Sequence, residues 1–281
     1  MKKIWPVHYA LGMAGIAVIR NWMAGDETAK ACADELVRLT RGFTDDPALG
    51  FVLDIPDMEV RSGYGAWAET YDNLPNPLIT IEEPVIQRLL DAIPPGRALD
   101  AACGTGRYTR YLGSRGHQVT GVDVTADMIQ RARARALGAK FLAGSLDALP
   151  FAAGSFDLVM CGLALTHLPQ VSGAIAEFAR VLRPGGRAII ADHHPMAGFL
   201  GGSAIFRDKN GYFRNVKSFV HPHAEYISAF VAAGLEIRGC FEPVLTEALA
   251  ASGLLFAIAP QAFLKGSVGL PIALIWLLSR R

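Results

Sequence analysis

Apolar residues recur with a helical period along the first part of the chain. In residues 7–18 they fall at positions i, i+4, i+7 and i+11, which predicts one helix with an apolar face. The same period in residues 29–39 predicts a second helix, and Asp26 stands where a side chain would cap its start. Shorter helices are expected over residues 64–71 and 81–92, the latter beginning at the pair of glutamates before Pro84.

From Arg97 onward, short apolar runs alternate with helical patterns. Strands are expected in residues 98–101, 117–122, 156–161, 187–191, 235–241 and 272–278, and helices in residues 107–114, 126–137, 172–182 and 224–233. Such alternation is typical of a parallel sheet with helices on both faces. The organisation predicted is a helical N-terminal cap over residues 1–92 and an α/β core over residues 93–281. Residues 193–223 have no period and are expected to form an insertion that covers the substrate.

Composition narrows the classes of function. The 281 residues are 51% hydrophobic, and 27 basic residues nearly balance 26 acidic ones, so no strong field attracts nucleic acid or an anionic membrane. The four cysteines form no CxxC pair, which disfavours a zinc knuckle or a disulfide framework and favours the cytoplasm. The apolar stretches 4–19 and 266–278 are each shorter than the roughly 20 residues of a membrane span, and a proline interrupts both. We expect both to be buried parts of a soluble protein.

A glycine-rich turn follows the first strand of the core. Residues 99–106 read Leu-Asp-Ala-Ala-Cys-Gly-Thr-Gly and open a helix, and Gly104 and Gly106 allow a tight turn and close approach of a ligand. The third glycine of the dinucleotide fingerprint is absent, because Thr109 stands there. The next strand ends at Asp123, whose carboxylate can accept hydrogen bonds from both hydroxyls of a ribose. These features suit both a nicotinamide enzyme and a methyltransferase.

Further motifs separate the two classes. Gly-Ser-Leu-Asp-Ala-Leu-Pro-Phe at 144–151, Ser-Phe-Asp-Leu-Val at 155–159 and Leu-Arg-Pro-Gly-Gly at 182–186 follow in order. With them the chain resembles the class I S-adenosylmethionine-dependent methyltransferases, especially the ubiquinone and menaquinone group of small-molecule enzymes. The resemblance implies a Rossmann-like, doubly wound sheet of seven strands in the order 3-2-1-4-5-7-6, with the last strand antiparallel. No tyrosine has a lysine four residues later, which disfavours a short-chain oxidoreductase.

The resemblance also implies where the cofactor, S-adenosyl-L-methionine, would lie. Asp100 and the Gly104–Gly106 loop would hold its methionine end and Asp123 its ribose. Asp147 would accept from the adenine amino group, with the backbone N–H of Leu146 facing the ring. Tyr64 and Tyr71 would close over the cofactor. The further cofactor-binding residues implied are Cys103, Val124, Met128, Ser145, Cys161 and Gly162.

Methyl transfer needs a base only when the acceptor is a hydroxyl or an acidic carbon, and histidine is the obvious candidate. His167, His193 and His194 follow the central strands and are the catalytic candidates. His221 and His223 lie in the insertion, but no carboxylate stands at ligand spacing, so no metal is expected. Arg207, Lys209, Arg214 and Lys217 in the insertion suit a solvated face, with an acidic or phosphorylated substrate as the alternative.

The acceptor is expected to be small and apolar, of natural-product size, because the cap and insertion are rich in aromatic residues: Trp5, Trp22, Trp67, Phe199, Phe206 and Phe213. Methylation of oxygen or carbon is favoured over nitrogen, with S-adenosyl-L-homocysteine as the product. A fold relative that binds the cofactor without transferring its methyl group stays open, and so does a homodimer. Neither nucleic acid nor membrane is expected as a partner.

Overall fold

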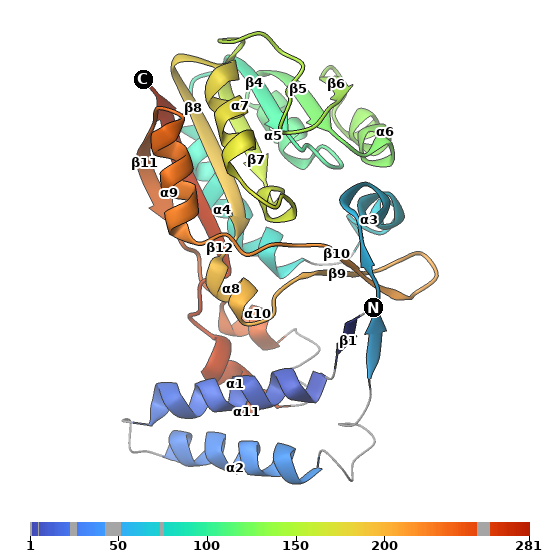
Figure 1. Ribbon diagram of the computed structural model, residues 1–281, viewed down its shortest axis with the longest axis vertical. Helices are drawn as coiled ribbons and strands as arrows, with labels where there is room; N and C mark the ends of the chain where they lie inside the picture. The colour runs from blue at the N-terminus through green and yellow to red at the C-terminus, as the bar shows by residue number, and fades with distance from the viewer. Residues whose placement is uncertain (1, 5, 23–26, 43–51, 74–75, 252–258) are drawn as a thin grey trace. The chain divides into compact units, whose positions relative to one another are not determined.

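The computed structural model describes residues 2–4, 6–22, 27–42, 52–73, 76–251 and 259–281, drawn as ribbon in Figure 1. The chain divides into two compact units. One contains residues 1–57 and 244–271, and the other contains residues 58–243 and 272–281.

The first unit is mainly helical. Its described elements are β1 (Lys2–Ile4), α1 (Pro6–Asn21), α2 (Glu27–Gly42), β2 (Leu53–Ile55), α10 (Glu247–Ala251) and α11 (Pro260–Ser267). Both helices expected from the N-terminal periods are confirmed, whereas Asp26 and Trp5 lie outside the described residues. Helix α11 packs closely on α1, since a Cβ at Gly266 would stand 2.5 Å from the carbonyl oxygen of Met13. Among the described residues, no helix is both long and apolar enough to cross a bilayer.

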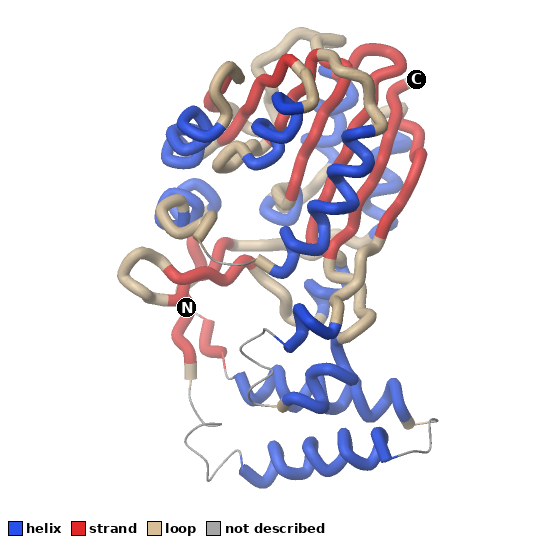
Figure 2. Tube along the Cα trace, turned by 180° about the vertical axis from the view of Figure 1, so that it is seen from behind, coloured by secondary structure: helices blue, strands red, loops and turns tan. Residues whose placement is uncertain are grey.

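The second unit is built on a seven-stranded sheet (Figure 2). Its strands are β4 (Arg97–Ala101), β5 (Gln118–Asp123), β6 (Lys140–Ala143), β7 (Phe156–Gly162), β8 (Leu182–His193), β11 (Leu235–Phe241) and β12 (Ala273–Arg280). They lie in the order β11-β12-β8-β7-β4-β5-β6. Strand β12 pairs antiparallel with both of its neighbours, and the remaining pairs are parallel. Counted along the chain from β4, this order reads 3-2-1-4-5-7-6 from the β6 edge.

Helices cover both faces of this sheet, as Figure 1 shows. Helices α7 (Ser172–Val181) and α9 (His223–Ala232) share one apolar cluster with Leu99 and Ala101 of β4. Helices α4 (Pro77–Asp91) and α5 (Arg107–Ser114) share the opposite cluster with Ala98. Because neighbouring strand residues point to opposite faces and both faces are buried, the central strands are continuous apolar runs.

A small aromatic layer forms from segments that are far apart in sequence. Helix α3 (Val60–Trp67) packs against the hairpin of β9 (Ala204–Arg207) and β10 (Phe213–Val216), which pairs with β3 (Asp57–Met58). Trp67 stacks on Phe206 with ring centroids 4.6 Å apart and planes 9° apart. The segment 193–223, which has no sequence period, therefore contains both this hairpin and the short helix α8 (Pro195–Phe199). Strands of four residues are too short for a period to stand out.

Three sequence expectations differ from the structure. The compact boundary falls at residue 57 rather than 92, because α4 packs on β8 and β12 of the large sheet, and residues 244–271 join the first unit instead of the core. Helix α4 begins at Pro77, where Asn76 caps it, and contains Pro84 in its interior. Helix α3 ends at Trp67, so Tyr71 lies in the turn that follows it.

Candidate active site

The glycine loop after β4 is tied to the end of β5. The N–H of Cys103 donates to Val122 over 2.9 Å, and the N–H of Gly104 donates to Oδ2 of Asp123 over 2.9 Å. Gly104 has φ +51° and nothing within 4 Å of the place where a Cβ would stand, so the loop has open space on that side. Gly106 has φ +83° and lies against α6 (Ala126–Arg135), since a Cβ there would stand 3.1 Å from the Cα of Ala132. The two glycines therefore serve different purposes.

Asp123 is held rigidly at the tip of β5. Its Oδ1 accepts the N–H of Thr125 over 2.8 Å while Oδ2 accepts from Gly104. Burial raises the pKa of Asp123 above its usual value, and the backbone N–H bonds oppose that rise. Each carboxylate oxygen still has a lone pair to accept another donor. The hydroxyl of Thr125 is buried beside it and has no partner among the described residues.

A buried ion pair lies at the start of α5, next to the glycine loop. Nη2 of Arg107 donates to Oε1 of Glu82 over 2.7 Å, and the Tyr108 hydroxyl donates to the same oxygen over 3.1 Å. Glu82 is completely buried, and its Oε2 has no partner among the described residues; neither has Nη1 of Arg107. A buried charged group with an unused donor or acceptor is costly, so this pair is suited to receive a ligand of mixed charge. The sequence predicts Glu82 at a helix start, with a role facing the acceptor as the alternative, and it gives no signal for the pairing with Arg107.

A second polar contact braces the same loop. The Thr105 hydroxyl donates to Oδ1 of Asp72 over 3.0 Å, and Arg135 at the end of α6 forms an ion pair with Asp72 at 2.6 Å. Asp72 follows Tyr71 directly, so this network joins the turn after α3 to the glycine loop. The sequence gives no signal for it, because the three residues come from separate segments.

Tyr64 and His167 form a hydrogen-bonded pair. His167 lies in the single turn η1 (Leu165–His167) after β7, and its Nδ1 stands 2.8 Å from the carbonyl oxygen of Lys217. A carbonyl only accepts, so Nδ1 carries the proton and Nε2 accepts from the Tyr64 hydroxyl at 2.8 Å. Burial lowers the pKa of His167 and raises that of Tyr64 well above its usual value, so both groups are neutral.

His193 differs from the other two candidate histidines. Its half-buried imidazole makes no hydrogen bond to any residue that the structure describes, whereas its backbone N–H donates to Asp192 over 2.8 Å. Burial, together with nearby His167, lowers the pKa of His193 to about 4. Asp192 is buried and also accepts the Tyr226 hydroxyl over 2.7 Å, and burial raises its pKa to about 6. Of the three histidines, His193 is the one whose ring is available to a ligand.

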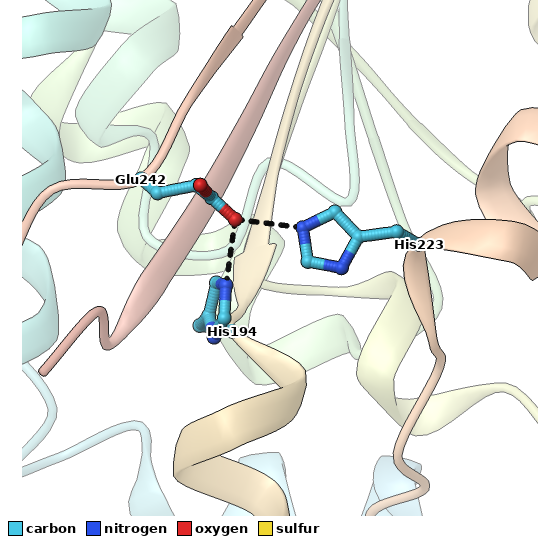
Figure 3. Close-up of side chains that lie close together, drawn as sticks. All are labelled: His194, His223 and Glu242. Carbon is cyan, nitrogen blue, oxygen red and sulfur yellow. Dashed lines mark hydrogen bonds and ion pairs between the residues drawn. The ribbon is translucent and has the colours of Figure 1, made fainter.

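His194 belongs to another cluster, which Figure 3 shows. Its Nδ1 accepts the N–H of Met196 over 3.0 Å and so caps α8, while its Nε2 donates to Oε1 of Glu242 over 2.9 Å. Nε2 of His223 donates to the same oxygen over 2.8 Å. One donor atom from each imidazole and one carboxylate oxygen lie within 4.8 Å of one another, so Glu242 supplies the carboxylate that is missing from the sequence pattern. Both ring nitrogens of His194 are occupied, and this argues against a catalytic role for it.

The other residues expected at the cofactor fall into two groups. Exposed or half-buried near the sheet edge are Val124, Ser145, Asp147, Gly162 and Tyr71. Buried are Asp100, Cys103, Met128, Leu146 and Cys161. Asp100 accepts the Thr109 hydroxyl over 2.6 Å on the α5 side of the sheet, and Cys161 packs in the cluster on the α7 side. The Cys103 thiol lies beneath the loop, 2.9 Å from the place of a Cβ at Gly121, so it supports the loop rather than lining an open site.

The central part of the chain matches a known protein family. Residues 99–190 match the model of the methyltransferase domain family. The match begins within β4 and ends within β8, so the methyltransferase domain includes the glycine loop, Asp123 and His167.

This chain matches only part of the length of each individual relative. A malonyl-[acyl-carrier protein] O-methyltransferase of Erwinia pyrifoliae is 34% identical over 47% of this chain and 50% of its own. A demethylmenaquinone methyltransferase of Beutenbergia cavernae is 33% identical over 50% of this chain and 55% of its own. The chain thus spans about half the length of these curated relatives. The crystal structure of an S-adenosylmethionine-dependent methyltransferase from Mesorhizobium loti shares the fold of the methyltransferase domain, with TM-score 0.55, 21% identity, and coverage of 71% of this chain and 98% of that one.

Proposed function

We propose that this chain transfers the methyl group of S-adenosylmethionine to a small acceptor, at oxygen or carbon rather than nitrogen. The observation that carries the proposal is the bond between the Gly104 N–H and Asp123 at the ends of β4 and β5. Strand β4 lies between β7 and β5, so the strand order reverses beside it. In open α/β sheets, ligands bind at the carboxyl ends of strands at such a switch point.

The proposed placement of the cofactor follows from the unused polar atoms. The free lone pairs of Asp123 suit the two ribose hydroxyls. Nη1 of Arg107 suits the carboxylate of the methionine part, and Oε2 of Glu82 suits its ammonium group. The exposed carboxylate of Asp147 and the backbone N–H of Leu146 are assigned to adenine. A zwitterion at the Glu82–Arg107 pair would satisfy two buried atoms at once.

The acceptor is placed beside His193. Its neutral, uncommitted ring follows β8, and His167 with Tyr64 stands close to it after β7. Displacement at the methyl carbon needs an in-line approach, so the protein acts mainly by positioning. When the acceptor is a hydroxyl or acidic carbon, His193 takes its proton. Helix α3 and the β9–β10 hairpin, joined by Trp67 and Phe206, are proposed to cover this side of the site.

The names of the two relatives suggest acceptors to test. One acts on a malonyl group carried by a protein and the other on demethylmenaquinone. A malonyl carboxylate is already nucleophilic and needs no base, unlike a hydroxyl or an acidic carbon. Transfer of labelled methyl from S-adenosylmethionine to each of them would therefore also indicate whether a base is used.

Calorimetry with the full chain tests the cofactor assignment before any acceptor is known. S-adenosylmethionine and S-adenosylhomocysteine should bind, and NAD should not. Asp123→Ala should weaken binding of both by roughly 2–3 kcal/mol, the scale of lost charge-assisted hydrogen bonds. The matched control is Asp91→Ala, which removes an exposed carboxylate that pairs with Arg115. Unchanged affinity in the Asp123 variant would refute the assignment of Asp123, and no binding by the wild type would refute the function.

A further inference from the structure

The cluster of His194, His223 and Glu242 has the donor set of a metal site. We propose that it binds a single divalent ion of the zinc class, through one nitrogen of each imidazole and one oxygen of the carboxylate. Two imidazoles with one carboxylate, plus water, form a recognised zinc ligand set. Softer thiolate ligands are absent from the trio, and hard cations such as Mg²⁺ prefer sets made of oxygen alone.

The fold brings the three groups together from the ends of three regular elements. His194 directly follows β8, His223 is the first residue of α9, and Glu242 directly follows β11. Strands β8 and β11 flank β12 and run in the same direction, so they end at the same edge of the sheet. The imidazole of His223 is held edge-on to both Trp276, at 5.9 Å, and His194, at 5.2 Å. The donors are therefore directed by the sheet and not by a mobile loop.

The two nitrogen–oxygen distances need only a small expansion to admit the ion. Each Nε2 lies 2.8–2.9 Å from Oε1 of Glu242. Zinc bonds of about 2.0–2.2 Å in a tetrahedral site place neighbouring donors about 3.3 Å apart. The side chains of His223 and Glu242 are 35% and 47% exposed, so they can move by this amount and admit both the ion and a water ligand. The side chain of His194, 7% exposed, would be the fixed ligand (Figure 3).

Binding would alter the start of α8. At present Nδ1 of His194 accepts from Met196, so the proton of the neutral ring is on Nε2. An ion on Nε2 displaces that proton, and a neutral ring must then carry it on Nδ1, opposite the Met196 N–H. The N-cap of α8 would be lost, at a cost of about tenfold in equilibrium constant. The binding free energy of structural zinc sites exceeds this cost by several orders of magnitude in equilibrium constant. Zinc should therefore bind although the N-cap is lost. Metal binding would thus release the first turn of the segment that follows β8.

The test uses the full chain, stripped with a chelator and titrated with zinc chloride by calorimetry. We expect one ion per chain with a Kd of about 1 µM or tighter, and visible d–d absorption of tetrahedral geometry when Co²⁺ replaces zinc. Glu242→Gln and His223→Asn should each weaken binding at least about tenfold, because each removes a direct ligand. Both residues are at the surface, and a thermal melt of each variant checks that it folds.

Two controls make the result specific. Glu236→Gln removes a carboxylate from the same strand, where it pairs with Arg238 and Arg281, and should leave the affinity unchanged. Cys240→Ser removes the exposed thiol on β11 and should also have no effect. Amide exchange at Met196 should accelerate when zinc is added to the wild type, and not in Glu242→Gln.

Each other outcome overturns either the metal site or its effect on α8. If the wild type shows neither heat nor Co²⁺ absorption, the trio is only a hydrogen-bonded clamp. If zinc binds equally well to Glu242→Gln, or if Cys240→Ser abolishes binding, the ion lies elsewhere. Zinc that binds through the trio without accelerating exchange at Met196 would refute the release of α8.

Discussion

The hydroxyl of Tyr64 is fully committed to Nε2 of His167, 2.8 Å away. Because the Lys217 carbonyl fixes the proton of His167 on Nδ1, this bond has one direction, from the phenol to the imidazole. Tyr64 therefore has no hydroxyl proton to offer a ligand, and His167 has no free nitrogen. What Tyr64 can present to a cofactor is the face of its ring, and a ring face attracts a cation such as a sulfonium.

Substitutions at Tyr64 should separate these two contributions. Tyr64→Phe keeps the ring but leaves a buried imidazole nitrogen unpaired. It should destabilise the fold by about 1–3 kcal/mol and change affinity for S-adenosylmethionine only within a few fold. Tyr64→Leu removes the ring and should weaken binding of the cationic S-adenosylmethionine by about 0.5–2 kcal/mol more than that of neutral S-adenosylhomocysteine. Urea unfolding measures the change in stability, and calorimetry measures the change in affinity for each ligand.

Tyr212→Leu is the matched control, since Tyr212 is exposed on the connection between β9 and β10. It should change the affinity for neither S-adenosylmethionine nor S-adenosylhomocysteine. An equal loss for both ligands in Tyr64→Leu would mean that the ring acts by shape alone.

His193 should matter for turnover rather than for cofactor binding. A general base contributes typically about 10²- to 10⁴-fold, so His193→Asn should lose that much rate with an acceptor that must be deprotonated. Affinity for S-adenosylmethionine should stay within a few fold. With its pKa lowered to about 4, His193 remains neutral from pH 8 to pH 6, and its protonation should slow the reaction only as the pH falls toward 4.

The rate of labelled methyl transfer, followed against pH, checks this expectation. A rate that already falls by half near pH 6.5 would indicate a base with an ordinary histidine pKa. Near-normal turnover of His193→Asn with a hydroxyl acceptor would show that proximity alone suffices.

The part of the fold that could be predicted from sequence is the part that depends on local pattern. Strand β4, the Gly104–Gly106 turn and helix α5 follow from an apolar run, two glycines and a helical period. Asp123 could be placed because it ends the next run. By contrast, Glu82 lies on a helix that continues through Pro84, and its partner Arg107 is 25 residues away, so no local pattern joins them.

Pairings across long separations decide which histidine is free. The contacts of His167 with Tyr64 and of His194 with Glu242 span 103 and 48 residues, respectively. The sequence places all three histidines after strands of the sheet, but it does not show which of their rings are hydrogen-bonded. Only tertiary contacts show that His193 alone among them keeps its ring nitrogens unbonded to the described part of the chain.

Gly104 and Gly138 form a pair that separates conformational strain from contact with a ligand. Both have positive φ, +51° and +91°, and both have nothing within 4 Å of the place of a Cβ. Alanine at either position should cost about 1 kcal/mol of stability because of the left-handed backbone. Only Gly104→Ala should also weaken the binding of S-adenosylmethionine, at least about tenfold, because the methyl group of the new alanine projects into the open space beside the loop. Thermal melts and calorimetry on both variants measure this. Equal affinities would show that the cofactor does not approach Gly104.

Asp100 should make stability depend on pH in an unusual direction. Burial raises the pKa of this carboxyl from 3.8 to about 6 in the folded protein, although its bond from Thr109 opposes the rise. The folded state therefore binds more protons than the unfolded state between about pH 4 and 6. The contribution of Asp100 to stability is greatest below pH 4 and is lost as the pH rises through 6.

Asp100→Asn removes this dependence and keeps an oxygen to accept the Thr109 hydroxyl. Relative to the wild type, it should therefore gain about 1–2 kcal/mol in the free energy of unfolding between pH 5 and pH 7.5. Urea unfolding of both proteins at the two pH values measures the difference and cancels the other titrating groups. Asp91→Asn, at an exposed carboxylate paired with Arg115, is the control and should show no such gain. If Asp100→Asn instead lost stability relative to the wild type on going to pH 7.5, the carboxylate would be stabilised in its charged form. The favourable field would then have to come from Arg107, the cation that already acts on this group.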